Sequence, residues 1–389
     1  MMKPDERIYT AISGQAPDRV PVVPKIWVDL AARLTDTKLT EVITEPLTAL
    51  RVIVEAGIKC RVDGVRQFHF PKRRVLEADG KVFEVDEKGR RTGEIDMLGG
   101  LMTHLYDSKD FHLEDPYMMA HCQYWASKEP FVRNLKDASR IAVPDKAYYE
   151  EIGCGQRQRE AMKLAGDNVA ILGDCTSATL AFYVSLRGMH QALLDLIEHP
   201  QLVHRVMEKG VAIAIEKGKF NIDLGLKMLR LNDSVGNISV ISPNHWRTFV
   251  FPHMKEVCDE LHRYAPDVKI YCHICGNILP VAEDLVKAGI DCIGPLDPLG
   301  GFTPLEIRER IGDSVVLMGG VDTLSFINST SEEIVEEARK CIVQAGRKGG
   351  YILGSGCVIP RSTRKRNVEA LRTASEQYGI YQNGHLKVH

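Results

Sequence analysis

Residues 268–277, VKIYCHICGN, decide both the fold and the candidate chemistry of this chain. The first six residues are a short, mostly apolar run that predicts a strand, and ILPVAEDLVKAG at 278–289 then predicts a helix. Another apolar run follows at 291–294. A strand, a helix and a further strand in this order are typical of a βα unit in a parallel sheet.

The same alternation of short apolar runs and longer amphipathic stretches continues from about residue 165 onward. It predicts six strands, at 168–173, 226–231, 268–273, 291–294, 315–319 and 350–354. Two more strands are expected in the first half, at 20–27 (VPVVPKIW) and 62–70 (VDGVRQFHF). Eight strands with helices between them predict an α/β protein, a single (β/α)8 TIM barrel over residues 1–389.

Local signals set several element boundaries. Ser242-Pro243, Thr303-Pro304 and Thr330 each predict a helix start, because a hydroxyl can cap the first free amides and proline suits the first turn. In the first half, alternating residues around an Asp-Gly and a Lys-Gly pair predict β-hairpins inserted at about 74–106. We expect residues 107–165 to be a second, mostly helical insertion.

The composition limits the function classes. With 50 basic and 52 acidic residues the net charge is −2, which does not favour binding to nucleic acid or to an anionic membrane. No run of about 18 apolar residues and no apolar signal region are present, so we expect a cytoplasmic protein. The ten cysteines are scattered along a large chain, which favours free thiols or metal ligands over disulfides.

A candidate metal site is formed by His273, Cys275 and Cys357. The first two are two positions apart, so in an extended chain their side chains point to the same face. Cys357 lies in GSGCVIP (354–360), directly after the last expected strand. The loops after the strands of a barrel meet at one mouth, where active sites of this fold are built. One imidazole and two thiolates suit Zn2+, and three protein ligands leave a fourth place for substrate.

Other residues at expected strand ends are candidates for the same mouth. Asp297 in GPLD could be the fourth metal ligand at rest. Asn232 and Asp233 in RLNDSVG, and Asp322 in GGVDT, could contact substrate, and Cys175 in LGDCTS could line the pocket.

Packing is the alternative interpretation of each of these residues. A lone His-x-Cys pair is more often a buried thiol beside a hydrogen-bonded histidine than a metal site. The third soft ligand, in a glycine-rich loop that the fold brings close, is what favours the metal. Cys272 and Cys292 are expected in the core. Four cations at or near expected strands could face the pocket, since an unpaired charge is costly to bury: Arg19, Lys25, Arg66 and Arg230.

The chain resembles the uroporphyrinogen decarboxylase superfamily over nearly its whole length. The likeness lies in APDRVPVVP (16–24), LGDCTSATLAFYVSLRG (172–188), RLNDSVGNISVISPNHWRTFVFPHMKEV (230–257), GGVDTL (319–324) and LGSGCVIP (353–360). The resemblance implies a (β/α)8 barrel.

Within that superfamily, His273, Cys275 and Cys357 are similar to the zinc site of the corrinoid-dependent methyltransferases, which include the methylcobamide:coenzyme M methyltransferases. The resemblance implies Zn2+ and methyl transfer between cobalamin on a partner corrinoid protein and a small thiol or a methoxylated or methylated substrate. Cobalamin-independent methionine synthase has a similar order of ligands, which would give Asp297 the acidic ligand position, although with Asp in place of Glu.

The chain departs from the decarboxylases themselves. PVVPKIWVDLAARL (21–34) lacks their arginine-rich segment, VRQFHFPKRR (65–74) lacks their catalytic Asp, and Ser355-Gly356-Cys357 stands where they have His. A metal-free decarboxylase would not need Cys275 and Cys357. Three hypotheses therefore follow, in this order: a zinc methyltransferase, a tetrapyrrole decarboxylase, and a non-catalytic module that binds a corrinoid protein or porphyrin.

Overall fold

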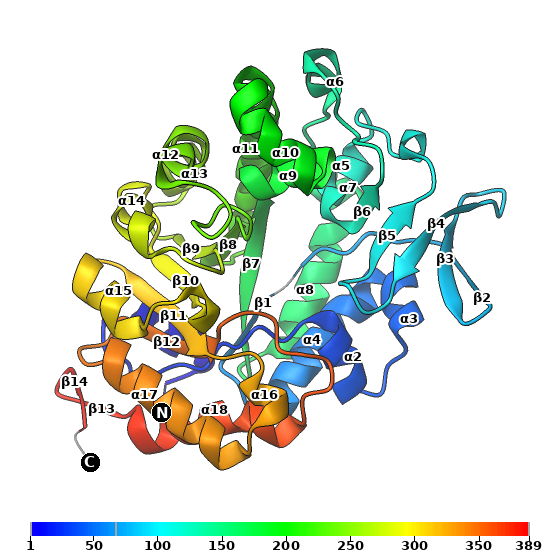
Figure 1. The fold of residues 1–389 in the computed structure, drawn as a ribbon. Helices are drawn as coiled ribbons and strands as arrows, with labels where there is room; N and C mark the ends of the chain where they lie inside the picture. The colour runs from blue at the N-terminus through cyan, green and yellow to red at the C-terminus, as the bar shows by residue number, and fades with distance from the viewer. Residues whose placement is uncertain (1, 67, 388–389) are drawn as a thin grey trace.

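A computed structural model describes residues 2–66 and 68–387 of the chain. Its centre is a seven-stranded parallel sheet in the order β1-β7-β8-β9-β10-β11-β12 (Figure 1). The strands are β1 (Gly64–Arg66), β7 (Ala170–Ser177), β8 (Met228–Asn232), β9 (Lys269–His273), β10 (Cys292–Leu296), β11 (Val316–Val321) and β12 (Tyr351–Ser355). All six strands predicted from about residue 165 onward are confirmed, and each lies within a few residues of its predicted range.

The gap between the two edges of this sheet is filled by the backbone of residues 21–25. Val23 N donates to Leu353 O (2.8 Å) on β12, and Leu353 N donates to Pro21 O (2.8 Å). On the other side, Asp63 N donates to Val22 O (2.8 Å) just before β1. The segment 21–25, called the closing segment below, therefore joins the first and last strands and curls the sheet into a ring.

The two first-half strands are shorter than predicted. The closing segment forms isolated bridges rather than a strand ladder, because Pro21 and Pro24 have no N–H to donate. The run predicted at 62–70 is a strand only over Gly64–Arg66, and residue 67 of that run lies outside the described residues.

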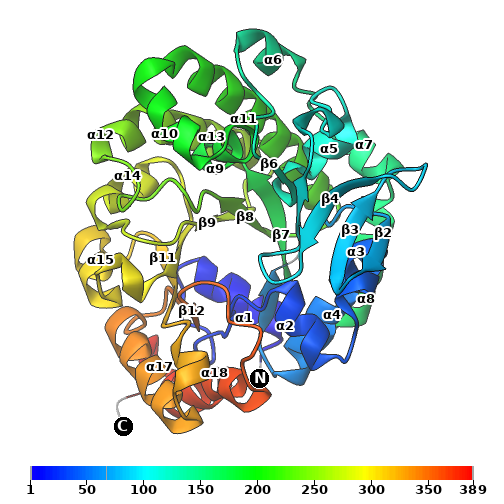
Figure 2. The same cartoon turned by 45° about the vertical axis from the view of Figure 1, so that its right-hand side comes forward.

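Helices surround the ring on its outer side (Figures 1 and 2). The predicted starts are confirmed: Ser242 caps α12, and Thr303 and Thr330 form capping boxes with Glu306 and Glu333. These outer helices are α2 (Val28–Leu34), α3 (Leu39–Thr44), α4 (Pro46–Lys59), α8 (Cys154–Ala165), α9 (Leu180–Arg187), α10 (Met189–Glu198), α11 (Pro200–Asp223), α12 (Pro243–His245), α13 (Phe251–Tyr264), α14 (Ala282–Lys287), α15 (Pro304–Ile311), α16 (Ser325–Asn328), α17 (Ser331–Ala345) and α18 (Lys365–Tyr378).

Residues 75–127 contain a second, five-stranded sheet beside the ring, formed by β2 (Val75–Ala78), β3 (Lys81–Val85), β4 (Arg91–Asp96), β5 (Met102–Leu105) and β6 (Trp125–Ser127). Strands β2 to β5 pair antiparallel, with turns at Asp79-Gly80 and around Lys88-Gly89, as the pattern predicts. The short helix α5 (Pro116–Ala120) lies between β5 and β6, and α6 (Leu135–Arg140) and α7 (Lys146–Glu151) follow β6. Figure 2 places this sheet at one side of the molecule.

Apolar side chains fill the inside of the ring. Leu172, Met228, Tyr271, Met318 and Ile352 each come from a different strand and are at most 5% exposed. Ile8, Ala11 and Ile12 of α1 (Pro4–Ile12) belong to the same cluster. The ring interior is thus a packed core, as is usual in such barrels. Within the described residues, no helix has the length and apolarity needed to cross a membrane.

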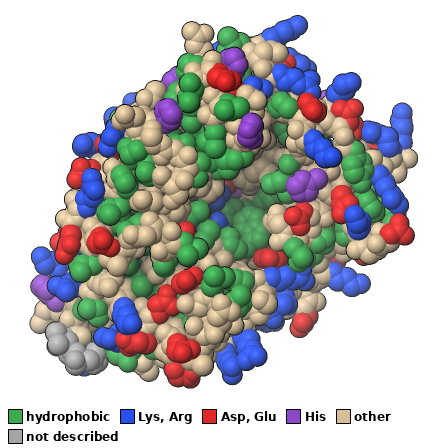
Figure 3. Space-filling view, viewed as in Figure 1, with side chains coloured by type: hydrophobic (Ala, Val, Ile, Leu, Met, Phe, Trp, Pro, Cys, Tyr) green, Lys and Arg blue, Asp and Glu red, His purple; other side chains and the backbone are tan. Residues whose placement is uncertain are grey.

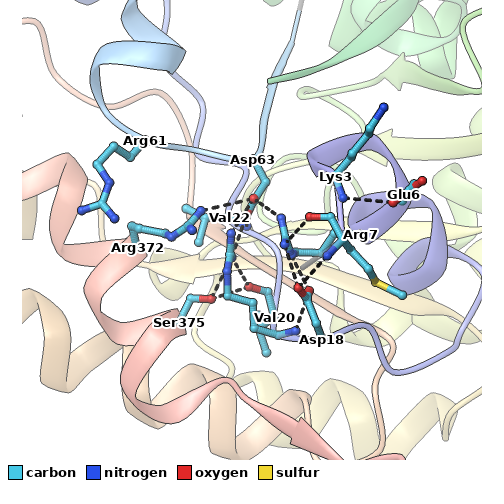
Figure 4. A network of polar contacts seen from close by, with 12 residues as sticks. Lys3, Glu6, Arg7, Asp18, Val20, Val22, Arg61, Asp63, Arg372 and Ser375 are labelled. Atoms are coloured by element: carbon cyan, nitrogen blue, oxygen red, sulfur yellow. Dashed lines mark hydrogen bonds and ion pairs between the residues drawn. The ribbon is translucent and has the colours of Figure 1, made fainter. Parts of the chain in front are cut away.

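A buried ionic network ties the closing segment to its neighbours (Figure 4). The Asp63 carboxylate, 0% exposed, accepts two hydrogen bonds from Arg19 (2.7 and 2.6 Å), one from Arg7 (2.8 Å) and one from Val22 N (2.8 Å). Arg7 also pairs with Asp18. The network joins α1, the closing segment and the residue before β1, so it stabilises the closure of the ring.

Candidate metal centre

The structure brings His273, Cys275 and Cys357 together. One imidazole nitrogen and the two sulfur atoms all lie within 4.8 Å of one another, which is the spacing of ligands around one metal ion. His273 is fully buried at the end of β9, and the two cysteines are half-buried in the loops after β9 and β12. This is the convergence that the sequence predicts.

Two glycines allow the loops to approach. Gly276 follows Cys275 with φ +84°, and a Cβ there would lie 2.8 Å from the Asn237 side chain. A Cβ at Gly356, next to Cys357, would lie 2.7 Å from Pro298. The loop after β9 turns, and the loop after β12 closes on the loop after β10, because these positions lack a side chain.

The His273 ring is held on both sides. Its Nδ1 lies 2.5 Å from Tyr271 Oη, and its Nε2 lies 3.0 Å from Lys25 Nζ. Burial, and then the positive charges of Lys25, Arg66 and Arg230, lower the pKa of His273 well below its usual value, so the ring is neutral. Because an ammonium group only donates, Nε2 accepts from Lys25 and the ring proton lies on Nδ1, which donates to Tyr271. Nε2 is therefore the basic ring nitrogen, and a metal ion bound there would replace its hydrogen bond from Lys25.

The two thiols share one proton. A hydrogen bond from Cys275 lowers the pKa of Cys357, and the positive charge of Lys25 acts in the same direction. The same hydrogen bond raises the pKa of Cys275. Burial lowers the pKa of Lys25 to about 8, so at neutral pH it is mostly an ammonium group beside the Cys357 thiolate. One thiolate, a neutral imidazole and a second thiol are a donor set that fits Zn2+.

Three of the four cations that the sequence analysis names, Lys25, Arg66 and Arg230, are buried beneath the mouth of the ring. Arg230 on β8 pairs with Asp174 on β7 (2.7 Å), and Lys217 from α11 reaches the same carboxylate (3.0 Å). Despite its burial, these two cations lower the pKa of Asp174 to about 2. Lys25 and Arg66 are also buried here, whereas Arg19, the fourth, pairs with Asp63 at the closing segment.

The structure separates the other predicted residues into two groups. Asn232 lies beside His273 on the neighbouring strand and bonds to Arg230 (3.1 Å) and Ser177 (2.8 Å). The Asp297 carboxylate accepts from Gly276 N (3.1 Å) and from Leu299 N (3.0 Å), so it braces the loop of Cys275 and is not part of the three-ligand cluster.

The remaining three do not reach the cluster. Asp233 is fully buried and binds the Thr179 hydroxyl and the amides of Ala181 and Gly236, so it fixes the start of α9. Asp322 caps its own loop by accepting from Leu324 N (2.9 Å). The expectation that Cys175 lines the pocket is wrong: it is fully buried, and a Cβ on Gly218 of α11 would lie 3.3 Å from its sulfur.

Tyr271 and Lys217 are functional neighbours that sequence reasoning misses. Tyr271 stands two residues before His273 on the same strand, so period-two alternation places both on the inner face and gives a usable signal. Lys217 lies in a long amphipathic helix, and nothing in the sequence indicates that it reaches Asp174. Figure 3 shows a hollow near the centre of the face seen in Figure 1, with apolar side chains on its floor.

Comparison with known proteins finds both decarboxylases and methyltransferases. A uroporphyrinogen decarboxylase of Thermosynechococcus vestitus is 28% identical over 214 residues, covering 53% of this chain and 59% of that protein. A methylated-thiol–coenzyme M methyltransferase of Methanosarcina mazei is 25% identical over 185 residues, covering 46% of each chain. This chain therefore matches about half the length of these curated relatives.

Among solved structures, a methyltransferase from Methanosarcina mazei has a similar fold, with a TM-score of 0.66, 16% identity, and coverage of 97% of this chain and 99% of that one. The profile described as uroporphyrinogen decarboxylase (URO-D) matches residues 123–378, which is more than half of the chain. The fold and this match lead to the same conclusion: the chain belongs to the uroporphyrinogen decarboxylase (URO-D) family.

Proposed function

We propose that this protein is a zinc-dependent methyltransferase. It would move a methyl group between cobalamin on a corrinoid partner protein and a small thiol, or a methylated or methoxylated small molecule. The observation that carries the proposal is the convergence of His273, Cys275 and Cys357 within 4.8 Å at the mouth of the ring. The methyltransferase among the relatives supports this reaction class.

The residues present fit the metal. His273 is neutral with Nε2 unprotonated, and the two cysteines lie close enough to act as a pair of thiolate ligands. When bound, Zn2+ would act as a Lewis acid on the sulfur or oxygen that gains or loses the methyl group. The three-ligand cluster leaves a coordination place for that substrate atom, because Asp297 is engaged with the amides of its neighbours.

The other side chains of the site would orient and shield this chemistry. Tyr271 would hold His273 with Nε2 directed at the metal, and Lys25 would stabilise negative charge on the thiolates. The packed interior beneath the mouth would exclude water from that side of the site.

Metal content and methyl transfer test the proposal. The purified protein should hold about one zinc per chain, and transfer of methyl from free methylcobalamin to a small thiol should depend on it. Cys275→Ala and Cys357→Ala should lose both. Cys272→Ala is the matched control, because Cys272 is a fully buried neighbour that is not part of the cluster. Full zinc content and activity in Cys275→Ala would refute the assignment.

The decarboxylase relatives make tetrapyrrole decarboxylation the second candidate. The buried cations Lys25, Arg66 and Arg230 are the observation that favours it, since they could receive substrate carboxylates. Incubation with uroporphyrinogen distinguishes the two. Formation of coproporphyrinogen by protein treated with a strong chelator would support the decarboxylase and contradict the zinc methyltransferase.

A further inference from the structure

Cys275 and Cys357 differ from the other cysteines of the chain in their exposure. All ten cysteines lie among the described residues; these two are half-buried and the other eight are buried. Burial raises the pKa of each of those eight thiols, which leaves them with very little thiolate at neutral pH. Oxidation of a cysteine depends on access and on thiolate character. A dissolved oxidant should therefore react first with Cys275 and Cys357.

The two sulfur atoms are also close enough to be joined. They lie within 4.8 Å of each other, and a disulfide bond is about 2 Å long, so they would have to approach by less than about 3 Å. Neither cysteine belongs to a strand, and each is next to a glycine, Gly276 or Gly356. The contact from Cys275 Sγ to Ser234 O is 4.0 Å long and holds the thiol weakly. Side-chain rotation and small loop shifts can therefore bring the sulfurs together.

We propose that Cys275 and Cys357 form a reversible disulfide when no metal ion is bound and hydrogen peroxide is present. One sulfur attacks the peroxide, the O–O bond breaks, and the sulfur becomes a sulfenic acid while one oxygen leaves as water. The second thiol then attacks that sulfur, the S–S bond forms, and the other oxygen leaves as water. The two thiols together lose two electrons and two protons, and the peroxide is reduced to two water molecules.

The disulfide would remove both sulfur ligands of the candidate metal site at once. Thiolate is the form of cysteine that binds metal ions, so His273 would be the one ligand of the three that oxidation leaves intact. Metal ion and disulfide are therefore alternative states of the same pair, and oxidation would prevent metal binding until a thiol reductant restores the cysteines. Formation of the bond needs no zinc, so only its effect on metal binding rests on the proposed function.

Thiol counting and peptide mapping test the disulfide directly. The metal-free protein is treated with one equivalent of hydrogen peroxide, alkylated under denaturing conditions and digested without reductant. Free thiols should fall from ten to eight, a peptide pair joined through Cys275 and Cys357 should appear, and dithiothreitol should restore all ten thiols. Zinc at ten times its dissociation constant should slow the loss of thiols about tenfold. Cys272→Ala is the matched control, because this fully buried neighbour should not change the reaction.

The outcomes separate the disulfide from the metal chemistry. Sulfinic acid on either residue of wild type without the cross-linked peptide pair, a result that needs no variant, would overturn the disulfide. Loss of thiols spread over the buried cysteines would overturn it as well. In Cys275→Ser, Cys357 should instead gain two oxygen atoms, because the thiol that would trap its sulfenic acid is missing. A disulfide that forms equally fast with and without zinc would support the inference and count against the zinc-centred function.

Discussion

Asp63→Asn should destabilise the protein strongly, although Asp63 lies outside the candidate site. The carboxylate is 0% exposed and accepts four hydrogen bonds shorter than 3 Å, two of them from Arg19. Asparagine keeps one acceptor but removes the charge, and it turns an amide donor toward a guanidinium. Arg7 would still have Asp18, whereas Arg19, itself 3% exposed, would have no acidic partner in the network of Figure 4.

The size of the expected loss of stability follows from the number of arginines left without an acidic partner. Breaking one buried ion pair by removing one partner costs about 3–5 kcal/mol, and here one arginine is left unpaired. We expect that loss in the free energy of unfolding, measured by urea denaturation followed by circular dichroism. Asp313→Asn is the control, since Asp313 is 65% exposed and its ion pairs are 3.8 Å or longer, so its loss should be below about 1 kcal/mol.

A double variant tests whether the unpaired Arg19 charge causes the loss of stability. If the penalty comes from an unpaired buried charge, Asp63→Asn combined with Arg19→Met should be less destabilised than Asp63→Asn alone. If the free energy of unfolding of Asp63→Asn were lower than that of wild type by less than about 1 kcal/mol, the view that this network stabilises the ring closure would be refuted.

Three further predictions concern the site and its floor. Tyr271→Phe removes the acceptor of the His273 Nδ1 proton and should weaken zinc binding about 10–100-fold in chelator competition; an unchanged affinity would show that Tyr271 does not orient the ring. Asp297→Ala should keep zinc stoichiometry, because both carboxylate oxygens bind backbone amides; loss of zinc would make Asp297 a ligand. The pKa of Asp174 is lowered from 3.8 to about 2, so its contribution of about 2 kcal/mol should be complete above pH 5 and disappear as the pH falls through 2. Unfolding free energies from pH 5 to pH 2 should show this loss in wild type and not in Asp174→Asn.

Much of the fold and the cluster can be predicted from the sequence, because the signals are local or follow from symmetry. Apolar runs between amphipathic stretches give β7 to β12 directly. His273, Cys275 and Cys357 are predictable because His273 ends a strand and each cysteine follows one, and the carboxyl ends of parallel strands in a ring share one mouth.

The positions of some other side chains cannot be predicted in this way. They depend on local turns of the backbone and on how helices pack against strands. Cys175 belongs to a strand with a bulge between Asp174 and Thr176, where Thr176 has φ +70°. Leu172 and Asp174 face the ring interior, so Cys175 takes the outer face by ordinary alternation, and its thiol points toward α11. Cys275 lies in a loop rather than in the extended strand, so its meeting with His273 comes from the turn at Gly276. Lys217 reaches Asp174 only through helix packing.

The closing segment has a consequence for synthesis on the ribosome. Lys25 N bonds to Ser355 Oγ across 330 sequence positions, so the chain that carries Lys25 emerges long before its partner on β12 exists. Cys357 emerges last of the three candidate ligands. Until Cys357 has been made, the nascent chain can offer an incoming ion at most two of them, and the closing segment stays unpaired until β12 has been made. A complete candidate metal site can therefore form only after β12 and the loop that follows it have been made.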